Sequence, residues 1–364
     1  MKLHRLPLYA AAASLALAPA HLNAQTTVAT DPVGFTTVTI TPGTGTARRQ
    51  TMMSIPLLDV DPSLAGLSSG TISAVTSNSI IVTNAGWTAG ALSQPATPFV
   101  VQITSGPATG RFFLVASSAT TGGASGGATL ANTATNLFIS SISLTPITNN
   151  LANVGVSAGN TFKLYACDTL SWFGTPATTG IRGGTNAASA DNVVVTVNGA
   201  ATTYFFNTNT TNWQASSGPT SSRSNVALLP SYGVTYGRLG SNALSFVTTG
   251  QVPTISNRVA VKNSGVTILS SYWPTTNTLR GLGIQNLPGW VTGTNQTSTD
   301  NVMIVTGGSA ITYLYTGTNW RRGTGPTGSQ DNVVIPVGSS VQIIKKGSAS
   351  GYSTLSQSVP YSLN

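Results

Sequence analysis

Residues 191–206 carry the stretch DNVVVTVNGAATTYFF, and a related stretch, DNVMIVTGGSAITYLY, occupies residues 300–315. Both begin with Asp-Asn, continue into a run of mostly β-branched residues, and reach a pair of turn residues, Asn198-Gly199 or Gly307-Gly308. Such pairs favour a two-residue hairpin, because a type I′ turn needs positive φ at both central positions. Each stretch therefore predicts a β-hairpin.

The likeness between the two stretches continues beyond the hairpins. Asn212-Trp213 and Gly218-Pro219-Thr220 are matched downstream by Asn319-Trp320 and Gly325-Pro326-Thr327. The offset is 109 residues at the first aspartate and 107 at the tryptophan, so the copies differ by two residues in the loop after the hairpin. A period near 107 residues predicts duplication of a small β-domain. The tryptophan of each copy is expected to close its core.

Composition extends the β prediction to the whole chain. Alternating runs of Thr, Val, Ile, Tyr and Phe are interrupted by Gly, Asn, Ser and Pro. We expect an all-β protein of short antiparallel strands in tandem sandwich- or barrel-like modules. Its expected parts are a signal peptide at 1–24, an N-terminal β region at 25–150, a first module copy at 151–250 and a second at 251–364. Expected strands include residues 33–41, 51–58, 80–83, 99–103, 111–116, 161–166, 193–197, 203–206, 226–229, 302–306, 312–315, 333–337 and 340–345.

The N-terminus has the composition of a secretory signal peptide. Lys2 and Arg5 precede an apolar stretch at residues 6–20, which is too short and too rich in alanine for a bilayer span. Cleavage after Ala24 fits the small-residue rule, and an uncleaved anchor is the alternative. We therefore expect an exported protein without a transmembrane span, extracellular or on the outer cell surface, with the periplasm as the alternative.

The residue types available to the processed chain disfavour most catalytic mechanisms. The sequence has no glutamate, and its two histidines, His4 and His21, lie inside the predicted signal. General acid–base and activated-serine chemistry draw mainly on these residue types. The stretch at 66–70, GLSSG, matches the nucleophile-elbow pattern, but no histidine would remain to act as its base. We expect a protein that is not an enzyme and uses no cofactor.

Charge is sparse and scattered along the chain. The formal net charge is +9, or +7 without Lys2 and Arg5, and only 6% of residues are charged. A nucleic-acid-binding protein gathers its charge in one patch, so we expect no nucleic acid as partner. A surface rich in Ser, Thr, Asn and Gly suits a protein that packs into a layer or matrix. The single cysteine, Cys167, is expected to be a buried apolar residue rather than a reactive thiol.

Asp191, Asp300 and Asp331 each precede an asparagine at the start of a predicted strand. Their expected role is an Asx-type turn, in which the carboxylate accepts hydrogen bonds from nearby backbone amides. A calcium site is the alternative. The first copy has Ser224 where the second has Asp331, and serine can make the turn but cannot replace a carboxylate ligand. This substitution favours the turn.

Tryptophans are the candidate ligand-binding residues. Trp290, Trp273 and Trp87, with tyrosines nearby, could stack on sugar rings, as a flat apolar face with polar neighbours suits an amphipathic ligand. Trp290 follows Pro288-Gly289, which is typical of a loop, and is the strongest of the three. A polysaccharide is therefore one candidate partner.

Several segments resemble a known family. They are Asp31-Pro32-Val33-Gly34-Phe35, the stretch FVVQITSGPATGRFF at 99–113, Thr169-Leu170-Ser171-Trp172-Phe173-Gly174, the stretch ADNV at 190–193 and Asn212-Trp213. Together they resemble an uncharacterised family of exported β-rich proteins found in Verrucomicrobia. The resemblance implies export and repeated β structure. That family has no established activity, so it assigns no functional residue.

Two functions of different classes follow from the sequence. The first is a non-catalytic structural or adhesive protein of the cell surface or extracellular matrix, which associates with itself or with a cell-envelope polymer. Its support is the predicted signal, the repetition and the low charge. The alternative is a secreted carbohydrate-binding protein that uses exposed tryptophans.

Overall fold

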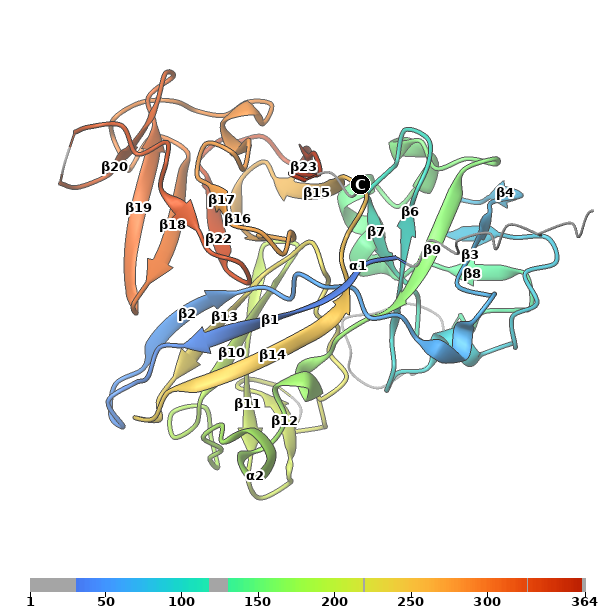
Figure 1. Cartoon of the computed structure of the whole chain (residues 1–364), viewed down its shortest axis with the longest axis horizontal. Helices are drawn as coiled ribbons and strands as arrows, with labels where there is room; N and C mark the ends of the chain where they lie inside the picture. Colours follow the sequence, from blue (N-terminus) through green and yellow to red (C-terminus); the bar gives the residue numbers. More distant parts are fainter. Residues whose placement is uncertain (1–30, 118–129, 219, 326, 362–364) are drawn as a thin grey trace, which may run out of the picture. The chain divides into compact units, whose positions relative to one another are not determined.

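The computed structural model describes residues 31–117, 130–218, 220–325 and 327–361. Among these residues the chain forms seven open antiparallel sheets joined by turns and very short helices (Figure 1). The all-β prediction is confirmed, and the open sheets make the modules sandwich-like. The predicted signal peptide with His4 and His21 lies outside the described residues.

The first five-stranded sheet contains the hairpin predicted at residues 191–206. Its strand order is β12-β11-β10-β13-β2, and Val197 of β10 pairs with Ala200 of β11. Asn198 and Gly199 between them have φ of +50° and +80°, as a type I′ turn requires. The strands are β10 (Asn192–Val197), β11 (Ala200–Asn207), β12 (Asn212–Ala215), β13 (Val234–Arg238) and β2 (Arg49–Met53).

A second five-stranded sheet has a matching layout. Its order is β16-β22-β18-β19-β20, and its hairpin turns at Gly307 and Gly308, where φ is +58° and +81°. Position by position, β18, β19 and β20 correspond to β10, β11 and β12, while β22 and β16 correspond to β13 and β2. The strands are β16 (Gly265–Ser270), β18 (Asn301–Thr306), β19 (Ser309–Tyr315), β20 (Trp320–Arg322) and β22 (Ser340–Lys345).

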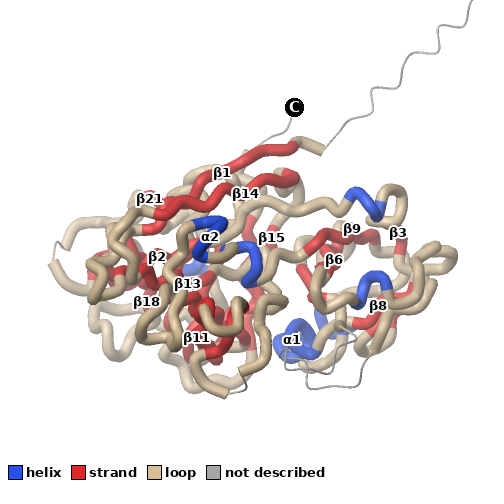
Figure 2. Tube along the Cα trace, turned by 90° about the horizontal axis from the view of Figure 1, so that it is seen from below, coloured by secondary structure: helices blue, strands red, loops and turns tan. Residues whose placement is uncertain are grey.

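A two-stranded ribbon packs on each five-stranded sheet. The first joins β1 (Val33–Ile40) to β14 (Leu244–Gln251), and the second joins β15 (Asn257–Lys262) to β23 (Tyr352–Gln357). Figure 2 shows β1 and β14 lying together on one side of β2 and β13. Alternate residues of each ribbon are buried, as period-2 side-chain placement requires. Ile40 and Phe246 enter the core of the first sandwich, and Val259 and Leu355 enter that of the second.

Two further sheets form a separate core. They have the orders β3-β9-β6-β7 and β4-β5-β8, and their core cluster draws on residues between Leu64 and Leu164. The strands are β3 (Ser69–Thr71), β4 (Ala74–Val75), β5 (Ser79–Ile81), β6 (Phe99–Ile103), β7 (Phe112–Leu114), β8 (Asn136–Phe138) and β9 (Thr161–Ala166), and the remaining pair is β17 (Asn277–Thr278) with β21 (Val334–Ile335). The short helices are α1 (Ser141–Leu144), α2 (Pro176–Thr179), η1 (Pro62–Leu64), η2 (Ala91–Ser93), η3 (Thr145–Ile147), η4 (Leu151–Val154), η5 (Leu170–Phe173) and η6 (Ile284–Asn286).

The cores divide the chain differently from the predicted boundaries. The first sandwich draws its core from residues 38–55 and 170–246, so β1 and β2 do not belong with the predicted N-terminal region at 25–150. Instead, the Leu64–Leu164 core is inserted between β2 and the rest of this sandwich. The reason is that β1 and β2 pair with β14 and β13, which lie far away in sequence. Alternation predicts a strand but not its partner.

One predicted strand is wrong. Residues 226–229 form no ladder beyond a single bridge at Ala227. The amide of Leu228 donates to the carbonyl of Asp168, and the amide of Val226 donates to the carbonyl of Arg223. The segment therefore lies along the 168–170 stretch, and its apolar residues fill a junction rather than a sheet.

Candidate functional site

Two of the three candidate tryptophans lie in cores. Trp87 is 4% exposed and packs edge-on against Phe162, with its Nε1 donating to the carbonyl of Leu67 at 3.2 Å. Trp273 is 1% exposed and contacts Tyr272 and Tyr361. Neither indole presents a face to solvent, so neither is retained as a sugar-binding residue. Sequence pattern alone could not separate these positions from loop positions, because both follow turn residues.

Trp290 is half-buried. Its ring lies edge-on to Trp320 at a centroid distance of 5.8 Å, and the Lys345 ammonium lies 5.3 Å from its centroid. The cation–π contact and the aromatic contact together hold the indole against the core of the second sandwich. Trp320 itself is fully buried, as is Trp213 in the first sandwich. The predicted core role of these two is confirmed.

Asp191 and Asp300 occupy equivalent positions and make equivalent bonds. Asp191 accepts from the amides of Arg182 and Leu239 at 2.8 and 2.7 Å, and Asp300 accepts from those of Val291 and Lys346 at 2.8 and 2.6 Å. Each carboxylate also pairs with a buried cation, Arg238 in the first case and Lys345 in the second. These aspartates close loops onto strands. With the carboxylates occupied in this way, they are not retained as calcium ligands.

Asp331 and Ser224 also make equivalent contacts. Asp331 accepts from the amide of Trp320 at 2.8 Å, and Ser224 Oγ accepts from that of Trp213 at 3.4 Å. Serine can therefore stand in one copy where aspartate stands in the other, because both side chains accept from the amide of the equivalent tryptophan. Asp331 additionally pairs with Arg280 at 2.9 Å. Among the described residues, no group of three or more His, Cys, Asp and Glu side chains could hold a metal.

The outer face of the β1–β14 ribbon carries three of the exposed large hydrophobic residues of the described chain. Val33 and Phe35 are 81% and 76% exposed, and Val247, which pairs with Thr37 on the same face, is 58% exposed. Neither strand contains a charged residue, and the eight-residue register runs without a bulge. Within the described residues the two strands pair with each other and with no further strand, apart from an isolated bridge between Gln251 at the end of β14 and Leu58. The ribbon thus lacks the charges, prolines and bulges by which sheet edges usually avoid association.

The matching ribbon of the second sandwich is covered. Its corresponding face carries Arg258, Ala260 and Lys262, all half-buried. The amide of Arg258 donates to the carbonyl of Gly110, and Lys262 Nζ lies 3.4 Å from the carbonyl of Asn198. Other parts of the chain therefore cover this face in one sandwich and leave it bare in the other. The predicted strand at 33–41 has apolar residues on both of its faces. That pattern was the sequence signal from which the exposed apolar face of the β1–β14 ribbon could have been predicted.

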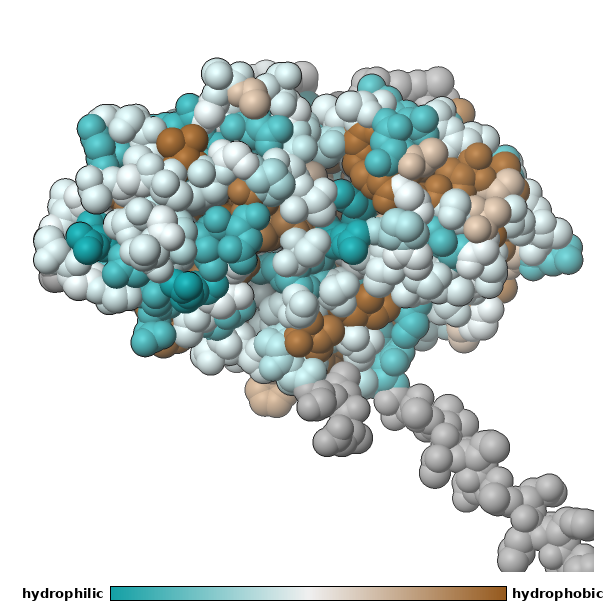
Figure 3. Space-filling view, turned by 90° about the horizontal axis from the view of Figure 1, so that it is seen from above, coloured by the Kyte–Doolittle hydropathy of each residue, from teal (hydrophilic) through white to brown (hydrophobic). Residues whose placement is uncertain are grey.

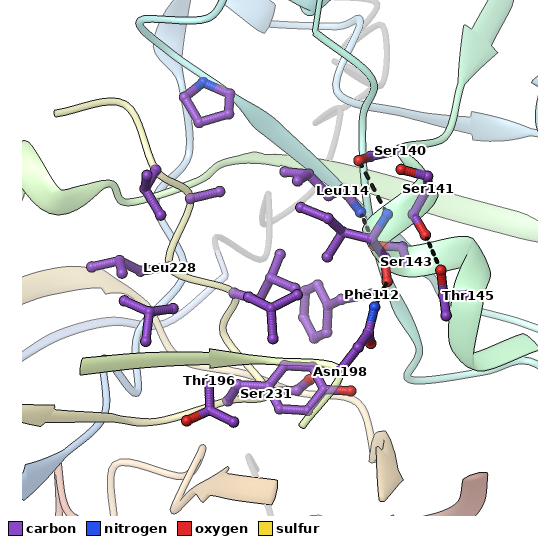
Figure 4. Close-up of a pocket in the computed structure, with 18 of the residues that line it drawn as sticks. Phe112, Leu114, Ser140, Ser141, Ser143, Thr145, Thr196, Asn198, Leu228 and Ser231 are labelled. Atoms are coloured by element: carbon purple, nitrogen blue, oxygen red, sulfur yellow. Dashed lines mark hydrogen bonds between the residues drawn. The ribbon is translucent and has the colours of Figure 1, made fainter. Parts of the chain in front are cut away.

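A cavity of about 540 Å³ lies where the inserted region meets the two sandwiches. Its walls combine apolar residues with serines, tyrosines and three arginines. Figure 4 shows side chains from β7 and α1 on one side and from the end of β10 on the other, where Asn198 Nδ2 donates to the carbonyl of Ile142 at 3.2 Å. Residues labelled in the figure include Phe112, Leu114, Ser140, Ser141, Ser143, Thr196, Leu228 and Ser231. Sequence reasoning missed this cavity, because its wall residues come from distant segments.

Comparisons with protein-family models, curated proteins and solved structures found no match to this chain. Within the described residues, no helix has the length and apolarity needed to cross a membrane.

Proposed function

We propose that this protein is an exported, non-catalytic structural or adhesive component of the cell surface or extracellular matrix, and that it associates with a second copy of itself through the β1–β14 ribbon. The observation that carries the proposal is the bare, uncharged outer face of that ribbon, with Val33, Phe35 and Val247 exposed. Export itself rests on the predicted signal at 1–24.

A second copy fits this face better than a charged partner does. Without the predicted signal the chain carries a formal net charge of +7, so like copies repel one another except where they present uncharged surface. The ribbon offers such a surface, and the two ribbons can meet face to face in a two-fold arrangement. Figure 3 shows one face of the molecule that is mostly pale, with few strongly hydrophilic residues, as suits a protein that packs into an assembly.

The test is the sedimentation of the chain beginning at Gln25, compared with a Phe35→Thr/Val247→Thr double variant. The wild type is expected to form dimers or larger species that persist in about 0.5 M NaCl, because apolar contacts are not screened by salt. The double variant is expected to be monomeric, with association weakened more than tenfold, since reburying each apolar side chain contributes about 1.5–3 kcal/mol. Threonine keeps the β propensity of both strands.

The matched control is Val334→Thr, which changes an equally exposed valine on β21 outside the ribbon. It should associate like the wild type. A wild type that stays monomeric at high concentration, or a control that loses association as the double variant does, would contradict the proposal. Of the three tryptophans named for the carbohydrate-binding alternative, only Trp290 retains partial exposure.

A further inference from the structure

The cavity described above is strongly asymmetric in charge. Arg111, Arg223 and Arg258 belong to its walls, and none of the described wall residues is acidic. None of the three arginines forms an ion pair with a described acidic residue. The ion pairs elsewhere in the described chain join Arg238, Arg280 and Lys345 to the aspartates already discussed. The arginines of the cavity differ from these residues because they have no described carboxylate partner.

Two of these arginines are buried, and one of them has a buried donor without a partner. Arg223 is 9% exposed, and its guanidinium makes no hydrogen bond to a described residue. Arg111 is 7% exposed; it donates to Thr354 Oγ1, but its Nε has no partner. Burying a cation without a counter-charge destabilises a fold. The buried Arg111 guanidinium, with one donor unpartnered, therefore costs stability, and an anion bound beside Arg111 and Arg223 would offset that cost.

The positive charge lies beside apolar and aromatic walls. Burial raises the pKa of the Tyr204 phenol, and the nearby charge of Arg223 opposes that rise. Burial likewise raises the pKa of Tyr232 to about 12, against the charge of Arg111. Phe112 and Leu228 contribute apolar surface to the same space. Ala200 and Ser217 belong to the walls and are exposed, so the cavity reaches the surface. Its volume of about 540 Å³ falls within the usual range for small-molecule sites.

We infer that this cavity binds a small organic anion with an apolar body, held by Arg223 and Arg111 at the anionic group and by the Phe112 side of the cavity at the body. Guanidinium groups bind carboxylate, sulfate and sulfonate groups through paired N–H donors, so any of these head groups fits. An inorganic anion would make no contact with the apolar walls, and a neutral amphiphile would give the arginines no counter-charge. Both classes therefore fit the cavity less well than an organic anion does. The inference does not depend on self-association through the β1–β14 ribbon.

The probe pair that tests it is 1-anilinonaphthalene-8-sulfonate and N-phenyl-1-naphthylamine, which share one ring system and differ in the sulfonate. Fluorescence titration of the full chain should show one sulfonate probe per chain, bound at least tenfold more tightly than the neutral probe. Decanoate should displace the sulfonate probe, whereas decanol and inorganic sulfate at the same concentration should not. Equal binding of the two probes, or displacement by sulfate alone, would overturn the inference.

Variants separate recognition from folding. Arg223→Met should weaken binding of the sulfonate probe at least tenfold while leaving the melting temperature unchanged or raised, because it removes a buried unpaired cation. Arg223→Lys keeps the positive charge but lacks the paired N–H donors of the guanidinium group, and it should give an intermediate affinity. Arg49→Gln, at an exposed arginine outside the cavity, is the control and should bind like the wild type. A merely structural Arg223 would instead lower the melting temperature on substitution, and unchanged probe affinity in Arg223→Met would contradict the assignment.

Discussion

Asp191 and Asp300 are buried aspartates that have the same structural role in the two sandwiches. Asp300 accepts from two backbone amides and Asp191 from three, and each carboxylate pairs with one buried cation, Lys345 or Arg238. A buried ion pair that is fully hydrogen-bonded fixes geometry more than it adds stability. These aspartates therefore anchor loops to strands through amides that are distant in sequence, so the predicted Asx-type turn, with its bonds to nearby amides, is wrong for Asp191 and Asp300.

Asp168 is a carboxylate in the opposite situation. Burial, with a smaller contribution from the charge of Asp59, raises its pKa to about 7. The Asp59–Ala166 bridge brings the two aspartates near each other. Because the folded-state pKa lies above the unfolded value of about 3.9, the folded state binds more protons between these values. Stability from this group is therefore full below about pH 4 and is lost as pH rises through about 7.

Asp168→Asn should remove this loss. At pH 8 we expect the variant to exceed the wild type in unfolding free energy by about 2 kcal/mol, after allowance for partial solvent access. Urea unfolding at pH 4.5, 6 and 8 measures the difference. Asp59→Asn removes the neighbouring charge and also a second carboxyl whose pKa burial raises, and it should flatten the pH profile less than Asp168→Asn does. Parallel profiles for Asp168→Asn and the wild type would count against this account.

At the scale of elements, the two hairpins explain why the central strands are well defined. Asn198-Gly199 and Gly307-Gly308 supply positive φ at both turn positions, and the twist of such turns matches that of the strands. Gly199 also lies against Lys262, since a Cβ there would approach Lys262 Cδ at 2.6 Å. The first hairpin is thus a contact point with the second sandwich as well as a turn.

Gly199→Ala is expected to destabilise the protein by about 1–2 kcal/mol, because an L side chain is strained at positive φ. Gly328→Ala is the matched control, since Gly328 lacks positive φ and has open space around its Cα. That control should lie within about 0.5 kcal/mol of the wild type. Chemical denaturation of both variants checks the comparison, and equal effects would show that the turn geometry is not the cause.

At the scale of the whole molecule, one apolar cluster joins the inserted region to the rest of the described chain. Val100 and Tyr165 from the inserted region meet Tyr272 and Trp273 from the second half. Gln102 Nε2 donates to Tyr272 Oη at 3.1 Å, and both side chains are buried. Cys167 lies in the same cluster, where burial raises the pKa of its thiol. Its predicted role as a buried apolar residue is confirmed.

This cluster should make unfolding cooperative. The wild type is expected to unfold in one transition in which tryptophan fluorescence and far-UV circular dichroism coincide. Trp273→Ala leaves a cavity at the junction and should lower the free energy of unfolding by about 3–5 kcal/mol. In this variant the unfolding curves measured by fluorescence and by circular dichroism should no longer coincide. Trp87→Ala, which empties an equally buried site within the inserted region, should lower the midpoint of a single transition. Coincident transitions in Trp273→Ala would contradict the proposed coupling.

The sequence by itself determined the features that depend on neighbouring residues. Positive φ at Asn198-Gly199 and alternation along the strands are local, so their patterns are visible in the chain. Only the tertiary structure decided which distant segments meet. It assigned β1 and β2 to the first sandwich, gathered Arg111, Arg223 and Arg258 around one cavity, buried Trp87 and Trp273, and left Phe35 bare. Pairing and burial depend on contacts between segments far apart in sequence, and local periodicity does not encode which partners those segments find.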